Sequence, residues 1–262
     1  MGLKSQNKVN FGILGFGIFG EKRLIPGFAG SKQANLMSLT KTDHATARAE
    51  AKKHGIPVEN AHENLNKFLN IEDMEAVFIA TPNKYHKEHT IMAAEAGKHV
   101  LLEKPMGMNA SECEEMIQAC EKAGVKFMIA HCMRFNDVVL DFKDMVDTGK
   151  IGDIVAMNAH FYYDGSRSSR DWLFDAEIAG GGPIADLGVH LIDTMRFISG
   201  KEVEKIQVIK KKTMQGSVES KAQILLEFEN NITAGVGVGF EGNYYTSLEV
   251  IGTECAVKAP FF

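Results

Sequence analysis

Asp186 and His190 lie four positions apart in the segment GGGPIADLGVH, which begins at Gly180. Proline is favoured in the first turn of a helix, so Pro183 predicts a helix that begins there, and residues four apart share one face of a helix. A histidine titrates near neutrality and can exchange a proton with an alcohol, while a carboxylate orients its ring. The spacing therefore predicts a proton-transfer site; the alternative is that Asp186 supports the helix start and His190 is buried. Asp193 falls on the same face and is either part of this group or structural.

Two polar segments directly follow apolar, strand-like runs. Thr81-Pro82-Asn83 follows the run 77–80, with His86 opening the next helix, and Glu103-Lys104-Pro105 follows the run 99–102. In an open α/β sheet, ligands bind at the carboxyl ends of the strands. A lysine at such an end, next to a proline, is well placed to reach a cofactor and a substrate hydroxyl. The alternative is that Lys104 is an exposed loop lysine.

The N-terminal segment KVNFGILGFGIFG places Gly15, Gly17 and Gly20 in a GxGxxG pattern. The pattern closes a predicted strand and opens a predicted helix, which is the context that a dinucleotide-binding turn requires. In such a turn Gly15 permits the tight bend, Gly17 lets the backbone approach the pyrophosphate, and Gly20 allows close packing of helix on strand. Backbone N–H groups at the helix start then face the phosphates, so we expect Gly15-Phe16-Gly17-Ile18-Phe19-Gly20 to bind the cofactor. The alternative is a plain glycine-rich turn.

The end of the second predicted strand indicates which dinucleotide binds. In an NAD-binding protein an acidic residue about 20 residues after the glycine turn bonds the ribose 2′-hydroxyl. Here the strand end reads Thr40-Lys41-Thr42-Asp43, with Lys41 at the expected position of the acid. A cation flanked by hydroxyl groups suits a 2′-phosphate, so the segment favours NADP over NAD, with Thr40 and Thr42 as further cofactor-binding residues. A register shift of two residues would instead make Asp43 the acid.

Composition excludes several classes of function. The 262 residues carry a net charge of −5 with a pI of about 6.0, so no basic field attracts nucleic acid. No apolar run approaches the roughly 20 residues that span a bilayer, and the N-terminal stretch lacks the features of a signal peptide. Cys113, Cys120, Cys132 and Cys255 form no CxxC pair and no zinc spacing, so we expect reduced cysteines, no metal and a cytoplasmic protein.

The order of the predicted elements indicates an α/β fold with two domains. In the first half, apolar runs alternate with helix-length stretches, which is typical of a doubly wound parallel sheet of the Rossmann type. The second half predicts an α+β domain with an open-faced, mostly antiparallel sheet, including a hairpin turn at Asn230-Asn231. We expect a dinucleotide-binding domain over residues 1–133 and a substrate and oligomerisation domain over residues 134–262. The expected strands are 8–15, 34–39, 56–58, 75–80, 99–102, 126–130, 154–163, 221–229, 232–240 and 245–251, and the expected helices after the glycine turn are 44–54, 63–69, 84–96, 110–123, 135–148 and 183–198.

The glycine turn, Thr81-Pro82-Asn83 with His86, Glu103-Lys104-Pro105 and the glycine-rich segment before His190 together resemble the glucose–fructose oxidoreductase/inositol dehydrogenase (Gfo/Idh/MocA) family of NAD(P)-dependent oxidoreductases. The matching segments span most of the chain in the order found in that family. The resemblance implies a Rossmann domain followed by an open-faced sheet that holds substrate and often forms the interface of a dimer or tetramer. It also implies that Lys104, Asp186 and His190 form the catalytic group. In similar enzymes the lysine polarises the reacting hydroxyl and contacts the cofactor, the histidine exchanges the proton, and hydride moves to or from nicotinamide C4.

The same resemblance indicates further substrate-binding residues. Arg134, after the sixth strand of the first half, and Trp172, on a loop before the glycine triplet, are expected near the substrate with Lys104, Asp186 and His190. Trp172 either stacks on a sugar face or packs beneath the loop. Relatives usually continue for several tens of residues beyond the point that matches Ile251-Gly252-Thr253, so the second domain is expected to lack its final strands and closing helix.

Three functions are weighed against these residues. The first is an NADP-dependent dehydrogenase or reductase that acts on a hydroxyl or carbonyl group of a sugar, sugar alcohol or cyclic diol, since Lys104, Asp186 and His190 are all present. The second is a non-catalytic, dinucleotide-sensing regulator on the same fold, but such relatives tend to lose the lysine or the histidine. The third is a glycosidase with transient oxidation, which would need metal or carboxylate machinery for which the sequence gives no signal.

Overall fold

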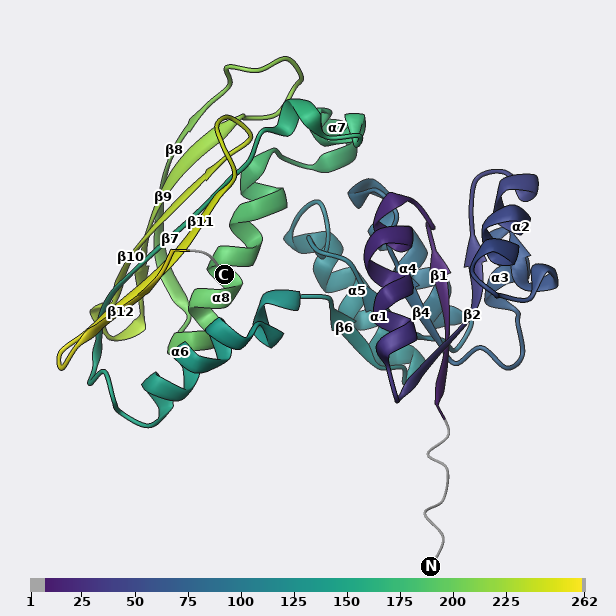
Figure 1. Ribbon diagram of the computed structural model, residues 1–262, viewed down its shortest axis with the longest axis horizontal. Coiled ribbons are helices and arrows are strands. Elements are labelled where there is room, and N and C mark those ends of the chain that lie inside the picture. The colour runs from purple at the N-terminus through teal and green to yellow at the C-terminus, as the bar shows by residue number, and fades with distance from the viewer. Residues whose placement is uncertain (1–7, 261–262) are drawn as a thin grey trace, which may run out of the picture. The chain divides into compact units, whose positions relative to one another are not determined.

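The computed structural model describes residues 8–260, and the chain divides into two compact units (Figure 1). The first unit ends at Ala130 and the second begins at His131. The boundary expected from the sequence, after residue 133, lies three residues further along the chain. Each unit has its own sheet and its own hydrophobic core, so we describe them separately.

The first unit is built on a parallel sheet of six strands in the order β3-β2-β1-β4-β5-β6. This is the strand order of a Rossmann fold, in which the connection reverses direction between β1 and β4. The structure confirms the fold class that the alternating pattern predicted. The strands are β1 (Val9–Leu14), β2 (Ala34–Thr40), β3 (Ala61–His62), β4 (Ala76–Ile79), β5 (His99–Leu102) and β6 (Phe127–Ile129).

Helices cover both faces of this sheet because successive strand residues point to opposite sides. Ile13 belongs to a core cluster with Ala47 and Ala51 of one helix, whereas Leu14 belongs to a cluster with Ala93 and Met116 of two others. Both strand residues are almost completely buried. The helical segments are η1 (Gly20–Leu24), which continues into α1 (Ile25–Gly30), α2 (His44–Lys53), α3 (Leu65–Leu69), α4 (His86–Glu95) and α5 (Ala110–Ala123).

The second unit is a mixed sheet in the order β12-β11-β7-β10-β9-β8. Only the β7–β10 pair is parallel and the other four pairs are antiparallel, which confirms the mostly antiparallel sheet expected from the sequence. Figure 1 shows α6 and α8 against one face of this sheet. The elements are α6 (Asp137–Asp147), β7 (Ile154–Tyr162), α7 (Ala176–Ala179), η7 (Ile184–Gly188), α8 (Val189–Ser199), β8 (Val203–Lys211), β9 (Lys221–Phe228), β10 (Thr233–Gly239), β11 (Tyr245–Gly252) and β12 (Ala256–Ala259).

Strand β9 shows how the second sheet has a covered face and an open one. Ile224 and Leu226 are buried in the core with α6 and α8, while Leu225 between them is 62% exposed. The hairpin from β9 to β10 turns at Asn230 and Asn231, whose φ angles of 61° and 58° are the left-handed values that a tight hairpin turn requires. The predicted hairpin is therefore confirmed.

One predicted strand was wrong. Residues 56–58 form no strand; Pro57 precedes a short 3₁₀ turn, Val58–Asn60, and the strand β3 follows at Ala61–His62. Pro57 has no N–H to donate to a ladder, which explains why pairing with β2 begins only after the turn. Strand β12 was not predicted, because its four residues carry too little periodicity. Among residues 8–260, no helix has the length and apolar character needed to cross a membrane.

Candidate active site

The end of β2 holds the glycine turn in place. Gly15 has a φ of +89°, and a Cβ there would lie 2.9 Å from the Thr81 backbone nitrogen, so glycine is required for both conformation and space. The Gly15 N–H donates to the Thr40 hydroxyl at 2.9 Å, and the Phe16 N–H donates to the Thr40 carbonyl at 2.9 Å. Thr40 is only 8% exposed, and these two hydrogen bonds make it a support for the turn; a direct cofactor contact for Thr40 stays a prediction.

The other two glycines differ in what surrounds them. A Cβ on Gly20 would lie 2.9 Å from the ring of Phe16, a residue of the turn itself, so the close approach here is to the turn rather than to a strand. A Cβ on Gly17 would meet no heavy atom within 4 Å, and the neighbouring side chains Ile18 and Phe19 are 52% and 42% exposed. The backbone at Gly17 is thus open to an approaching group. Such an opening at a helix start fits the pyrophosphate of a dinucleotide.

Asp43 caps helix α2. Its carboxylate accepts the Thr46 N–H at 2.8 Å and the Ala45 N–H at 3.4 Å, and the hydrogen bonds from Thr46 hold the pKa of Asp43 below its usual value. Because the Asp43 carboxylate is engaged in capping α2, the structure gives no support to Asp43 as a ribose-binding acid. Lys41 stands immediately after β2, where that acid was expected, and Thr42 is exposed beside it.

His86 joins the two loops that follow β4 and β5. Its ring is fully buried, with Nδ1 2.8 Å from the Pro105 carbonyl oxygen and Nε2 2.9 Å from the Thr81 carbonyl oxygen. A neutral imidazole carries a single N–H and donates to one of these carbonyls at a time. Burial lowers the pKa of His86, and the two carbonyls oppose that effect only in part. His86 therefore holds the Thr81 loop to the loop of Lys104, and a role of His86 in cofactor binding stays a prediction.

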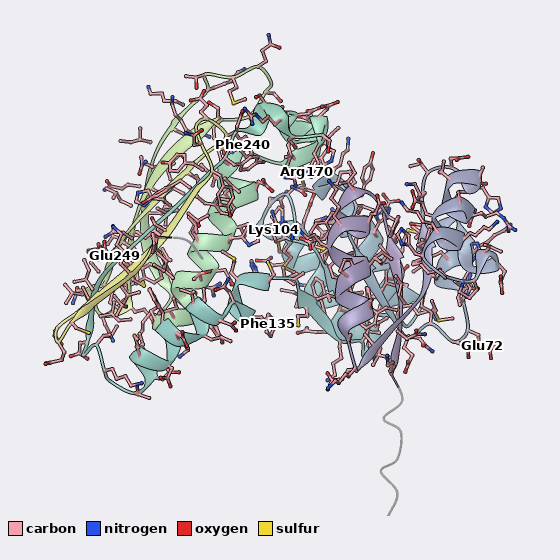
Figure 2. The ribbon with its side chains drawn as sticks, in the orientation of Figure 1. Glu72, Lys104, Phe135, Arg170, Phe240 and Glu249 are labelled. Carbon is pink, nitrogen blue, oxygen red and sulfur yellow. The ribbon has the colours of Figure 1, made fainter. Side chains whose placement is uncertain are left out.

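Lys104 lies at the carboxyl end of β5, within the loop that His86 holds. The side chain is half-buried, its peptide bond to Pro105 is cis, and its backbone N–H donates to the Glu103 carboxylate at 3.2 Å (Figure 2). Asn83, in the loop after β4, is 5% exposed. In the first unit the structure thus brings the glycine turn, Thr81-Pro82-Asn83 and Glu103-Lys104-Pro105 to the same edge of one parallel sheet.

Asp186 is a buried carboxylate held from two sides in the second unit. It lies in the π-helical turn η7, is 6% exposed, and accepts a hydrogen bond from the Tyr163 hydroxyl at 3.2 Å. The Arg170 guanidinium lies 3.5 Å from the same carboxylate oxygen. The Tyr163 ring packs on Phe240 at 5.3 Å between centroids. Burial first, and then the Asp186 charge, raise the pKa of Tyr163, so its hydroxyl stays protonated and remains a donor.

Glu219 supports the start of the helix that carries Asp186. Its carboxylate accepts the N–H groups of Gly182 and Ile184 at 3.1 and 3.2 Å. A Cβ on Gly182 would lie 2.0 Å from the Glu219 carbonyl oxygen, so this glycine is needed for the close approach. Since Glu219 provides the cap, Asp186 is not needed for that purpose. His190 follows on the next turn, in α8, and is half-buried.

Two residues expected at the substrate have partners inside the second unit. The Arg134 guanidinium donates to both carboxylate oxygens of Asp193 at 2.8 and 2.6 Å, and the His131 ring lies 3.5 Å from the same carboxylate. Asp193 is 5% exposed, so its carboxylate is the buried partner in the ion pair with Arg134. Trp172 lies under the Arg170 guanidinium, 5.9 Å from its ring centroid. A substrate contact for Arg134 or Trp172 stays a prediction.

Sequence reasoning missed Tyr163 and Glu219 as supporting residues. Tyr163 directly follows the carboxyl end of β7, a position that could have been noticed in the same way as Lys104. Glu219 lies in a loop 35 residues after Ile184, and no local pattern connects the two.

Comparison with known families assigns both halves of the chain. Residues 9–131 match the family described as an oxidoreductase family with an NAD-binding Rossmann fold. Residues 139–258 match the GFO/IDH/MocA C-terminal domain. The two matches cover the two units in the order in which they occur.

Similar proteins are oxidoreductases by name. An oxidoreductase of Formosa agariphila is 29% identical over 258 residues, which are 97% of this chain and 77% of that protein. A D-xylose 1-dehydrogenase (NADP⁺) of Haloferax volcanii is 29% identical over 238 residues, which are 90% of this chain and 71% of that protein. Among solved structures, the aldose-aldose oxidoreductase of Caulobacter crescentus has a TM-score of 0.91 and 27% identity over 96% of this chain and 76% of its own.

The burial of His86 predicts a loss of stability in acid. An unfolded histidine has a pKa of about 6.5, and burial lowers the pKa in the folded protein, so below pH 6.5 the unfolded chain binds a proton that the folded one resists. The stability present above that pH is then lost, by at most about 1.4 kcal/mol per pH unit from this residue. Chemical denaturation between about pH 7.5 and 5.5 should show a shallower decline for His86→Gln than for the unchanged protein. The exposed His44→Gln control should keep the original slope; equal slopes for all three would contradict the assignment.

Proposed function

Because the chain belongs to the GFO/IDH/MocA family of NAD(P)-dependent oxidoreductases, we propose that it transfers hydride between a nicotinamide dinucleotide and a hydroxyl or carbonyl group of a sugar or polyol. The observation that carries this proposal is the open backbone at Gly17 on a turn that Thr40 fixes, because it fits a dinucleotide pyrophosphate. The names of the relatives support the substrate class, since they include a D-xylose dehydrogenase and a 1,5-anhydro-D-fructose reductase.

Lys104, Asp186 and His190 are assigned to the chemical step. The Lys104 ammonium donates a hydrogen bond to the reacting oxygen and stabilises the negative charge that develops when the hydroxyl loses its proton. His190 accepts that proton in the oxidation direction and returns it in reduction. Asp186, held by Tyr163 and Arg170, supplies a fixed negative charge that orients the donor groups around the substrate. The nicotinamide, when bound, supplies the hydride acceptor or donor at C4.

The preference for NADP rests on Lys41. It occupies the strand-end position at which an NAD-binding chain carries its ribose-binding acid, and Asp43 is engaged as a helix cap. A cation there attracts a 2′-phosphate through a charge-assisted contact, whereas the 2′-hydroxyl of NAD offers it no charge.

Lys104→Met should separate binding from chemistry. The variant keeps the length of the side chain and loses the ammonium group, so we expect kcat to fall about 10²- to 10⁴-fold, the range typical of a lost proton-transfer partner. The Kd for the cofactor should change by less than about threefold. Steady-state kinetics with a panel of sugars and polyols, followed at the reduced-nicotinamide absorbance, and calorimetric titration provide the two readouts. Lys87→Met on α4, which removes a partly exposed ammonium paired with Glu115, is the matched control; full turnover in Lys104→Met would remove Lys104 from the mechanism.

Lys41→Asp should reverse the cofactor preference. The loss of a charge-assisted contact, worth roughly 1.5–3 kcal/mol, should weaken NADP⁺ binding about 10- to 100-fold. NAD⁺ should bind as well as before or better, because the new carboxylate can accept a hydrogen bond from the ribose. Calorimetric Kd values for both cofactors test this, with Lys122→Asp on α5 as control. An equal effect on both cofactors would argue against a 2′-phosphate site at Lys41.

The open face of the second sheet supports a homo-oligomer, which we include in the proposal. A hollow of about 370 Å³ on this sheet is lined by residues of β7, β8, β9 and β10, among them Asn158, Gln207 and Leu225. On β10, Gly235 and Gly237 alternate with buried valines and leave room for Asn158 and His160 to lie along the sheet. Exposed apolar side chains on a flat, uncovered face are typical of a surface that pairs with another copy.

Leu225→Asp should weaken association. A charge on this face is costly to bury between two copies, so the variant should shift toward monomer at concentrations where the unchanged protein is a dimer or tetramer. Size exclusion with light scattering over a dilution series measures the mass. Leu140→Asp, exposed on α6, is the control and should not shift. A monomeric mass for the unchanged protein at every concentration would rule the oligomer out.

A further inference from the structure

The strand-end cation Lys41 is already paired within the first unit. Its Nζ lies 3.7 Å from Glu50 Oε1 on helix α2 and 5.8 Å from the centroid of the Phe16 ring. The side chains of Lys41 and Glu50 are 26% and 23% exposed, so water screens the pair only in part. The end of β2 has no acidic residue at the position of Lys41, but Glu50, in the second turn of α2, places a carboxylate beside it.

Glu50 is the centre of a wider group of charges. Its other oxygen lies 3.8 Å from Lys53 Nζ and 3.5 Å from His54 Nε2, and Lys53 also pairs with Glu21. The group counts two lysines against two glutamates, so its net charge is zero when His54 is neutral. Ligand atoms of Glu21, Glu50 and His54 lie within 4.8 Å of one another, as in a metal site, but the two lysines already supply the positive charge there.

This group lies directly behind the glycine turn. The His54 ring packs on the Phe16 ring at 5.7 Å between centroids, and the Phe16 N–H donates to Thr40, the residue before Lys41. Phe16 is the second residue of the glycine turn and is 4% exposed. Lys41 and Glu50 are thus held against the turn that binds the cofactor, at its ribose end.

A 2′-phosphate and a 2′-hydroxyl respond differently to such a pair. The phosphate carries a charge of about −1.5 to −2 at neutral pH. To bind Lys41, the phosphate must compete with the Glu50 carboxylate, which also repels its negative charge. A 2′-hydroxyl is uncharged, so Glu50 does not repel it.

We propose that Glu50 is a specificity-determining residue that competes with the 2′-phosphate of NADP for Lys41 and so lets the protein accept both NADP and NAD. The proposal rests on the assignment of Lys41 to the ribose end of the cofactor. In this proposal Lys41 favours NADP over NAD, and Glu50 reduces the difference between the two affinities.

Glu50→Gln tests the competition, because it removes the charge and keeps the shape of the side chain. The Kd of NADP⁺ should fall about tenfold in calorimetric titrations at low ionic strength, while the Kd of NAD⁺ should change by less than about twofold. Glu72→Gln is the matched control, because Glu72 lies before the amino end of β4 (Figure 2) whereas Lys41 follows the carboxyl end of β2. The Kd values of both cofactors should be unchanged in this variant. Raising the salt concentration should shrink the difference between Glu50→Gln and the unchanged protein.

The Lys41→Ala and Lys41→Ala/Glu50→Gln variants complete the cycle. If Glu50 acts through Lys41, the gain in NADP⁺ affinity from Glu50→Gln should be at least halved on a logarithmic scale when Lys41 is absent. An unchanged NADP⁺ affinity in Glu50→Gln, or an equal gain for NAD⁺, would overturn the competition while leaving the proposed enzyme intact. If the unchanged protein bound neither cofactor, the proposed function would fail first, and that result is distinct from both.

Discussion

Two hydrogen bonds to Thr40 fix the glycine turn, and the cofactor half of the protein depends on them. The Thr40 hydroxyl and carbonyl accept the N–H groups of Gly15 and Phe16, so the turn after β1 is tied to the end of the neighbouring strand. The next residue, Lys41, is thereby placed beside Phe16. A single strand end thus sets both the backbone path of the glycine turn and the position of the Lys41 cation.

The regular elements could be predicted wherever the local signals agree. Helix α5 has the expected bounds because Asn109 caps its start and Gly124 ends it in a left-handed conformation. The hairpin between β9 and β10 followed from Asn230 and Asn231 for a similar reason. Strand β3 could not be located, since two residues show no period and the pairing that defines them is made with β2, far away in the sequence.

The residues of the candidate site were likewise predictable only in part. Motif positions such as Gly17 and Lys104 follow from spacing within one segment, but the groups that hold or oppose them come from elsewhere. Tyr163 reaches Asp186 from 23 residues earlier, and Glu50 reaches Lys41 from the second turn of the following helix. Such contacts depend on how strands and helices pack, and a single sequence carries no local pattern for them. The structure also bears on two alternatives: Asp43 caps α2 through the nearby Ala45 and Thr46, whereas the helix start before Asp186 is supported by Glu219, which is distant in the sequence.

The ring of His86 has a consequence for how the first unit folds and opens. Its two nitrogens face the carbonyls of Thr81 and Pro105, which belong to loops after adjacent strands. Neither loop can leave its native position without exposing this buried ring, so the two gain and lose their native contacts together. On the timescale of hydrogen exchange, the edge that carries Lys104 should therefore open as one cooperative unit rather than as two independently fraying loops.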